Sequence, residues 1–146
     1  MLSKLLIAFS LMALCVTIHA MGLTGAFRWM HARLARGTAG FWSATSMLVR
    51  IAVWTVLLHL IEILIWALFY VWRGAMPDFT TAAYFSAVTY TTTGYGDFVL
   101  PEAWRLVGGV EALTGILMCG LSTGFFFAVL VKTFEPASTA DRETRP

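Results

Sequence analysis

The stretch that decides the fold is Thr91-Thr92-Thr93-Gly94-Tyr95-Gly96-Asp97, residues 91–97. It is short, polar and rich in glycine, yet long apolar runs lie on both sides of it, at residues 47–72 and 106–131. Inside a bilayer, irregular backbone is tolerated only where protein surrounds it or where it lines a water-filled path. The stretch therefore predicts a functional loop within a membrane protein.

The composition supports a membrane protein. The 146 residues are 59% hydrophobic and 12% charged, and the mean hydropathy is +0.78. A helix needs about 20 apolar residues to cross roughly 30 Å of hydrocarbon, and three runs meet this length, at residues 5–23, 47–72 and 106–131. We expect an all-α membrane protein with three transmembrane helices and the lipid bilayer as its partner. The scattered arginines and the net charge of +2 argue against nucleic-acid binding.

The orientation follows from the positive charges. Residues 1–26 are predicted to form an N-terminal transmembrane helix, with a cytoplasmic basic amphipathic loop at 27–46. Four arginines follow this helix, whereas only Lys4 lies in its first residues. By the positive-inside rule, the N-terminus is then outside and the C-terminus is cytoplasmic. A signal peptide cleaved after Ala20 is the alternative.

The remaining elements follow from length and punctuation. An outer helix is predicted at 47–73, with Ser43 or Thr45 as its N-cap after a turn at Gly37–Gly40. Residues 79–91 are too few to span the membrane and suit a re-entrant pore helix, capped by Asp78 or Thr80. A loop at 92–97 and an inner helix at 103–132 follow, and a charged tail at 135–146 is expected to be disordered and cytoplasmic.

This arrangement resembles the potassium channel family over residues 47–134. The sharpest part of the resemblance is the filter signature Thr-x-Gly-Tyr-Gly-Asp at residues 92–97, with Thr89 at the upstream threonine of the family. The resemblance implies a small bacterial two-helix pore with one additional N-terminal helix, in the inner cell membrane. It also implies a homotetramer with K⁺ as permeant ion and no cofactor.

The residue types of the loop make physical sense for this task. A bare K⁺ ion needs several oxygens in place of its water, and rings of backbone carbonyls supply them. Successive carbonyls point the same way only if alternate residues adopt backbone conformations that are open mainly to glycine, and Gly94 and Gly96 have that spacing. The resemblance assigns the K⁺ filter to Thr92, Thr93, Gly94, Tyr95 and Gly96.

The residues around the filter are expected to hold it. Tyr95 would point away from the ion and pack against Tyr84 and Phe85 of the pore helix. Asp97 at the pore mouth would attract cations or tie the loop to its surroundings. Because C-terminal helix ends carry partial negative charge, the end of the pore helix would favour a cation.

Three histidine or glutamate residues lie within the runs at 47–72 and 106–131: His59, Glu62 and Glu111. His59 and Glu62 share a helix face. Two ligands make a weak metal site, and a mutual hydrogen bond or contact with a neighbouring helix is the favoured interpretation. Glu111 is expected at the depth of the pore helix, where it would either support the filter by bonding Ser86 or Thr89, or be a carboxyl satisfied without effect on conduction.

Hinge and gate candidates lie in the inner helix. Gly115, at the hinge position of the family, and Gly120 could let this helix bend, or could serve close packing. Phe126, in the run Phe125–Phe127, could form a dewetting constriction, or could pack toward lipid.

The favoured function is passive, potassium-selective conduction. The alternatives are a weakly selective cation channel and a non-conducting or regulatory subunit of a cation channel. An enzyme is not expected, because no catalytic triad, phosphate loop or metal cluster is recognisable in the sequence.

Overall fold

The computed structural model describes residues 2–34 and 40–134. Within these ranges the chain is helical and has no strand: α1 is Leu2–Leu34, α2 is Phe41–Trp72, α3 is Phe79–Tyr90, the 3-10 turn η1 is Glu102–Trp104 and α4 is Arg105–Phe134. Three helices, α1, α2 and the continuous η1–α4, are long and apolar enough to cross a membrane. The expected all-α class with three spanning helices is confirmed. The predicted tail at 135–146 and residues 37–39 of the predicted turn lie outside the described residues.

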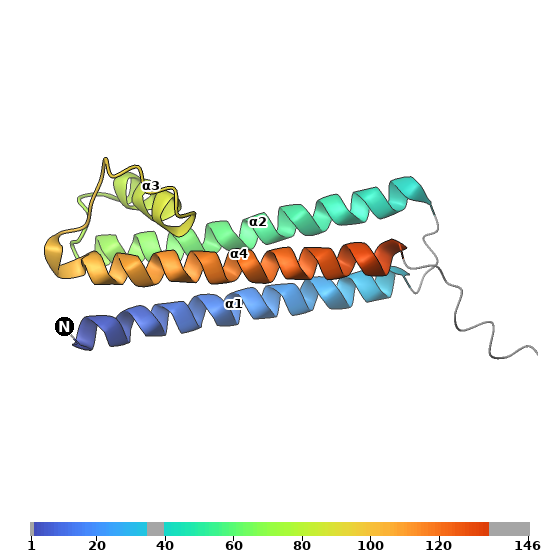
Figure 1. Cartoon of the computed structure of the whole chain (residues 1–146), viewed down its shortest axis with the longest axis horizontal. Coiled ribbons are helices and arrows are strands. Elements are labelled where there is room, and N and C mark those ends of the chain that lie inside the picture. Colours follow the sequence, from blue (N-terminus) through green and yellow to red (C-terminus); the bar gives the residue numbers. More distant parts are fainter. Residues whose placement is uncertain (1, 35–39, 135–146) are drawn as a thin grey trace, which may run out of the picture.

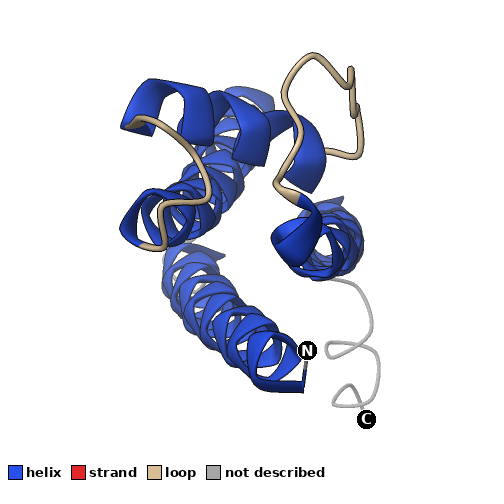
Figure 2. Ribbon diagram, turned by 90° about the vertical axis from the view of Figure 1, so that its left-hand side faces the viewer, coloured by secondary structure: helices blue, strands red, loops and turns tan. Residues whose placement is uncertain are grey.

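The three long helices lie side by side, and α3 is set against one end of the bundle (Figure 1). The N-terminus lies at this same end, so α1 and α4 run in one direction and α2 runs in the other. Figure 2 looks onto this end and shows its loops on the side away from the N-terminus. Lys4 ties α1 to this end, because its Nζ donates to the carbonyl of Ala103 at 2.9 Å and lies 4.4 Å from the centre of the Trp104 ring.

The helix ends differ from the prediction mainly around the expected loop 27–46. The helix α1 continues to Leu34, because residues 27–34 contain neither glycine nor proline to stop it. The helix α2 already begins at Phe41, and its N-cap is Gly40 rather than Ser43 or Thr45. Those two hydroxyls lie inside the first turns of the helix, where the Thr45 hydroxyl bonds back to the carbonyl of Phe41 at 3.0 Å.

The structure has a short helix where the pore helix is predicted at 79–91. The helix α3 covers residues 79–90, and Asp78 is its N-cap. The Asp78 carboxylate accepts hydrogen bonds from the Thr81 backbone N–H at 2.9 Å and from the Thr81 hydroxyl at 2.8 Å. These bonds favour the ionised carboxylate and lower the pKa of Asp78.

Buried side chains form two clusters along the bundle. The larger one surrounds α3 and is rich in aromatic rings, among them Trp66, Tyr70, Phe85 and Tyr90. The smaller one lies at the other end of the long helices and consists of Met30, Met47, Ile51 and Val129. The helix α1 contributes one buried stripe, with spacings of seven and four residues that keep it on one helix face: Ala8, Cys15, His19, Ala26 and Met30.

Candidate functional site

The loop after α3 has an alternating backbone. The φ angles of Thr92, Gly94 and Gly96 are positive, at 60°, 54° and 78°, while Thr93 and Tyr95 keep negative values. Reversing φ at every second residue turns every second peptide plane over, so that successive carbonyls can face one side. Glycine adopts these angles freely, whereas Thr92 does so at a cost of about 1–2 kcal/mol. The loop accepts that strain at one position.

The hydrogen bonds of the loop use its N–H groups. The N–H of Thr92 donates to the carbonyl of Thr89, and that of Gly94 to the carbonyl of Val88, both at 3.0 Å. Among the described residues, no backbone N–H donates to the carbonyls of residues 92–95. The loop is therefore fastened to the last turn of α3 through its donors, and its acceptors are left for another ligand.

Asp97 ties the loop back to α3. Its carboxylate accepts a hydrogen bond from the Tyr84 hydroxyl at 2.7 Å and one from the Phe98 backbone N–H at 3.1 Å. The bond to Asp97 favours the protonated phenol and raises the pKa of Tyr84. Of the two roles expected for Asp97, the geometry supplies the tie to the surroundings.

Tyr95 does not pack on its own α3. Its side chain is 72% exposed in the single chain. The Tyr84 ring instead contacts Phe98, with 5.9 Å between centroids, and the Phe85 ring contacts Tyr70 at 5.5 Å. The expected packing of Tyr95 against Tyr84 and Phe85 is thus not formed within one chain.

Glu111 has a different partner from the one expected. It is buried behind α3, and the Tyr70 hydroxyl on α2 donates to its Oε2 at 2.8 Å. Glu111 Oε1 and Ser86 Oγ are both buried without a hydrogen-bond partner. The Ser86 side chain still interacts with the Glu111 carboxyl, but the geometry of a full hydrogen bond, as predicted for Ser86 or Thr89, is not reached.

The two glycines proposed as hinges have different surroundings. A Cβ on Gly115 would lie 1.8 Å from the backbone oxygen of Tyr90, whereas one on Gly120 would meet nothing within 4 Å. Gly115 is therefore a position of close helix contact. Phe126 packs against the smaller cluster, while Phe127 is 65% exposed.

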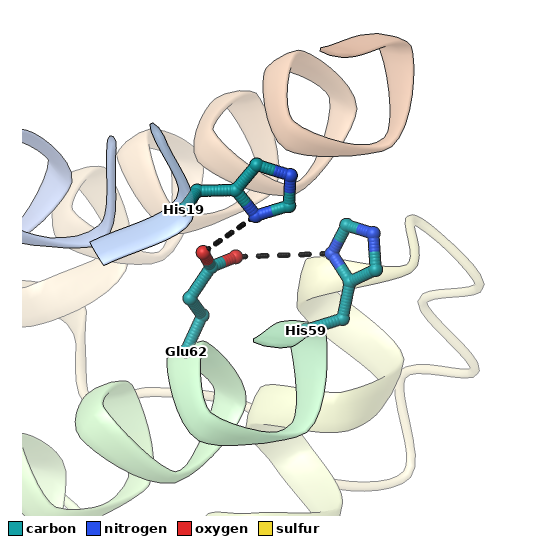
Figure 3. Close-up of side chains that lie close together, drawn as sticks. All are labelled: His19, His59 and Glu62. Atoms are coloured by element: carbon teal, nitrogen blue, oxygen red, sulfur yellow. Dashed lines mark hydrogen bonds and ion pairs between the residues drawn. The ribbon is translucent and has the colours of Figure 1, made fainter. Parts of the chain in front are cut away.

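The pair His59 and Glu62 belongs to a larger polar cluster (Figure 3). His59 Nδ1 lies 3.7 Å from Glu62 Oε2, too far for a hydrogen bond. The neighbouring helix supplies the closer partner, since His19 Nδ1 on α1 lies 2.8 Å from Glu62 Oε1. The expected contact with a neighbouring helix is present, and the expected mutual hydrogen bond is not.

Sequence reasoning missed three members of this cluster. Tyr90 at the end of α3 donates to Glu62, and its hydroxyl lies 3.0 Å from His59 Nδ1. Ser122 on α4 completes the cluster through both imidazoles. His19 carried a recognisable sign, because an ionisable residue inside an apolar run usually faces protein. Tyr90 and Ser122 are ordinary in such segments and carried none.

The comparison with models of protein families gave a match. The sequence model of a family described as "Ion channel" matches residues 58–132, just over half of the chain. No curated protein matches significantly, and no solved structure does. The matched residues run from the middle of α2 through α3 and the loop to the last turn of α4. The chain therefore belongs to this ion channel family, in agreement with the resemblance to potassium channels in its loop sequence.

Proposed function

We propose that the chain forms a homotetrameric channel that conducts K⁺ passively and selectively, with residues 92–96 as its filter. The observation that carries the proposal is the alternation of positive φ at Thr92, Gly94 and Gly96 in a loop whose carbonyls of residues 92–95 receive no backbone hydrogen bond from the described chain. Such carbonyls are the oxygens that replace the water shell of K⁺ in channel filters.

Two further features support a cation at this position. The C-terminal end of α3 lies directly before the loop and carries partial negative charge. Asp97 adds a carboxylate at the far end of the loop, held by Tyr84. Both favour cations over anions without choosing among cations, so the preference for K⁺ rests on the Thr-Thr-Gly-Tyr-Gly sequence.

Four copies are proposed because one chain offers only one carbonyl at each level of the path. In the single chain, residues 91–99 are exposed. A cyclic tetramer would bring four loops to one axis and would give the exposed Tyr95 ring a neighbouring chain to pack against. We place the assembly in the inner cell membrane with the loop end outside.

The direct test is ion flux through the purified protein in liposomes, with K⁺ and Na⁺ compared. We expect K⁺ flux well above Na⁺ flux. Equal fluxes would favour the weakly selective cation channel, and no flux from a folded tetramer would favour the non-conducting subunit. A different oligomeric state in native mass spectrometry would contradict the tetramer.

The sharper test is Gly94→Ala, with Gly74→Ala as its control. Both glycines have positive φ, 54° and 63°, and neither would place a new Cβ within 4 Å of another group. Each substitution therefore carries the same backbone cost, about 1–2 kcal/mol, but only Gly94 lies in the filter. We expect Gly94→Ala to abolish K⁺ flux. We expect the Gly74→Ala channel to keep the preference for K⁺ over Na⁺ of the parent channel. Equal behaviour of the two variants would contradict the filter assignment.

A further inference from the structure

We infer that His19, His59 and Glu62 form a binding site for a divalent transition metal ion of the Zn²⁺ class, between α1 and α2 and next to the end of α3. The three side chains offer ligand atoms that all lie within 4.8 Å of one another. His19 and Glu62 are fully buried, and the side chain of His59 is 18% exposed. Figure 3 shows both imidazole rings facing the carboxylate, one from each helix.

The cluster is a closed ring that has more contacts than protons when both imidazoles are neutral. Five contacts join Glu62 to His19, His19 to Ser122, Ser122 to His59, His59 to Tyr90, and Tyr90 back to Glu62. Each hydrogen bond needs one proton. With Glu62 ionised and both imidazoles neutral, the other four groups bring one proton each, so one contact has none. A cation at the carboxylate would remove this deficit.

The arrangement of Ser122 suits imidazoles that act as metal ligands. Its hydroxyl lies 2.9 Å from His19 Nε2 and 3.0 Å from His59 Nε2. A hydroxyl oxygen can accept two hydrogen bonds, so both Nε2 atoms can carry the proton. The Ser122 proton then serves no contact of the ring, and the contacts of both Nδ1 atoms, with Glu62 and with Tyr90, have no proton. Both Nδ1 atoms then present lone pairs to the Glu62 side. Holding the second nitrogen of each ligating histidine in this way is the usual support of a metal site.

The distances fit a small tetrahedral ion. Zn²⁺ binds nitrogen and oxygen at about 2.0–2.1 Å, so adjacent ligands lie about 3.3 Å apart. The two contacts between an Nδ1 and a carboxylate oxygen are 2.8 Å for His19 and 3.7 Å for His59, on either side of that value. These contacts involve Oε1 and Oε2 respectively, and the three ligand atoms all lie within 4.8 Å of one another, so the side chains would move together by up to about 1.5 Å around a bound ion.

The donor types select the class of metal. Two imidazole nitrogens with one carboxylate suit Zn²⁺ and its transition-metal neighbours, whereas Mg²⁺ and Ca²⁺ prefer oxygen ligands alone. Two histidines and a glutamate form a recognised zinc set with an open fourth position. The Tyr90 hydroxyl lies 3.0 Å from His59 Nδ1.

A bound metal would act on the end of α3, directly before the loop 91–97. Tyr90 is the last residue of α3. An ion that takes a carboxylate oxygen of Glu62 competes with the hydrogen bond from Tyr90 to that residue. Binding would therefore change how the end of α3 is fastened to α1 and α2. The site itself is independent of which ion the pore conducts.

The test is a Co²⁺ titration of the full chain, purified and stripped of metal with a chelator. We expect the visible absorption of tetrahedral Co²⁺ at one ion per chain, displaced by Zn²⁺. His19→Ala should abolish the absorption, and Ser122→Ala should weaken affinity by about 10–100-fold. The control is His31→Ala on the same helix, because the His31 ring contacts Phe27 rather than the cluster; it should bind as the parent does.

Two outcomes would overturn the site. One is absence of the Co²⁺ absorption in the folded parent protein. This includes the case in which the stability of the protein varies with pH but is not changed by metal, because the cluster then binds only a proton. The other is a His19→Ala variant that binds Co²⁺ like the parent. If His19→Ala does not fold, His59→Ala and Ser122→Ala keep the test decisive, since each leaves His19 and the buried carboxylate of Glu62 in place.

Discussion

At the scale of single residues, the contact between Gly115 and Tyr90 places α3 against α4. The backbone oxygen of Tyr90, at the end of α3, occupies the space that the Cβ of any residue other than glycine would need at position 115 of α4. In a membrane, helices associate through close van der Waals packing rather than through the hydrophobic effect, so small residues decide where backbones can meet. Gly115 is therefore expected to fix the depth of α3 and, with it, the loop that follows.

Gly115→Ala should destabilise the protein, and Gly120→Ala should not. The first variant would place a Cβ 1.8 Å from the Tyr90 oxygen, while the second meets nothing within 4 Å. Overpacking of this kind typically costs 1–3 kcal/mol, whereas replacing a helical glycine by alanine otherwise gains about 0.5–1 kcal/mol. Thermal unfolding of the purified proteins measures both. Equal stability with altered opening of the pore in Gly115→Ala would instead support the hinge interpretation.

At the scale of elements, α3 depends on its N-cap. Asp78 satisfies the first turn of a helix that has only 12 residues and crosses no membrane by itself. Because its hydrogen bonds to Thr81 lower the pKa of Asp78, the ionised form is favoured in the folded state. The stabilisation is therefore complete above the unfolded carboxyl pKa, about 3.9. It is lost as the pH falls below that value, through the lowered pKa of the folded state.

Two variants separate the cap from its charge. Asp78→Ala should lower the unfolding temperature at neutral pH, because the N–H of Thr81 loses its acceptor. Asp78→Asn keeps an acceptor oxygen but does not titrate, so it should remove the contribution of this residue to acid sensitivity below about pH 4. Thermal unfolding measured across this range checks both. An Asp78→Asn protein whose stability falls with acid as that of the parent does would show that other carboxyl groups determine the acid sensitivity.

Existence and length of the elements could be read from the sequence more reliably than their ends. Apolar length predicts the three spanning helices, and Asp78 marks the start of α3. The end of α1 could not be predicted from the sequence. The arginines at positions 28 and 33 suggest a surface segment, but they are equally compatible with a longer α1. Gly40 makes no side-chain cap bond at all, so the start of α2 had no hydroxyl to indicate it.

The loop could be predicted from the sequence, whereas the polar cluster could not. The loop is contiguous, so its alternating glycines already predict the backbone that Thr92, Gly94 and Gly96 adopt. The cluster brings together side chains of four helices, up to 103 residues apart in sequence. Which face of α1 meets α2 depends on the rotation of both helices. That rotation is set by packing such as that of Gly22, where a Cβ would lie 2.5 Å from Leu58.

At the scale of the whole molecule, α1 runs parallel to α4 and spans the full length of the pore unit (Figure 1). Lys4 binds it to Ala103 and Trp104 at the loop end, His19 to Glu62 and Ser122 in the middle, and Met30 to the smaller cluster at the far end. A helix fastened at three depths behaves as part of the pore unit rather than as a separate anchor. Its first residues must then share a membrane side with the loop.

Thiol labelling tests this arrangement. In a background with Cys15→Ala and Cys119→Ala, single cysteines replace Ser3, Phe98 or Lys132, which are exposed residues at the two ends of the bundle. A membrane-impermeant reagent applied to right-side-out vesicles should label Ser3→Cys and Phe98→Cys, and should reach Lys132→Cys only after permeabilisation. This result follows because Arg28, Arg33 and Arg50 lie near the end opposite the loop, and arginine-rich ends stay in the cytoplasm. Labelling of Phe98→Cys without Ser3→Cys would contradict the parallel course of α1 and α4. Labelling of Lys132→Cys alone would be compatible with the fold but would show that its orientation in the membrane is the opposite one.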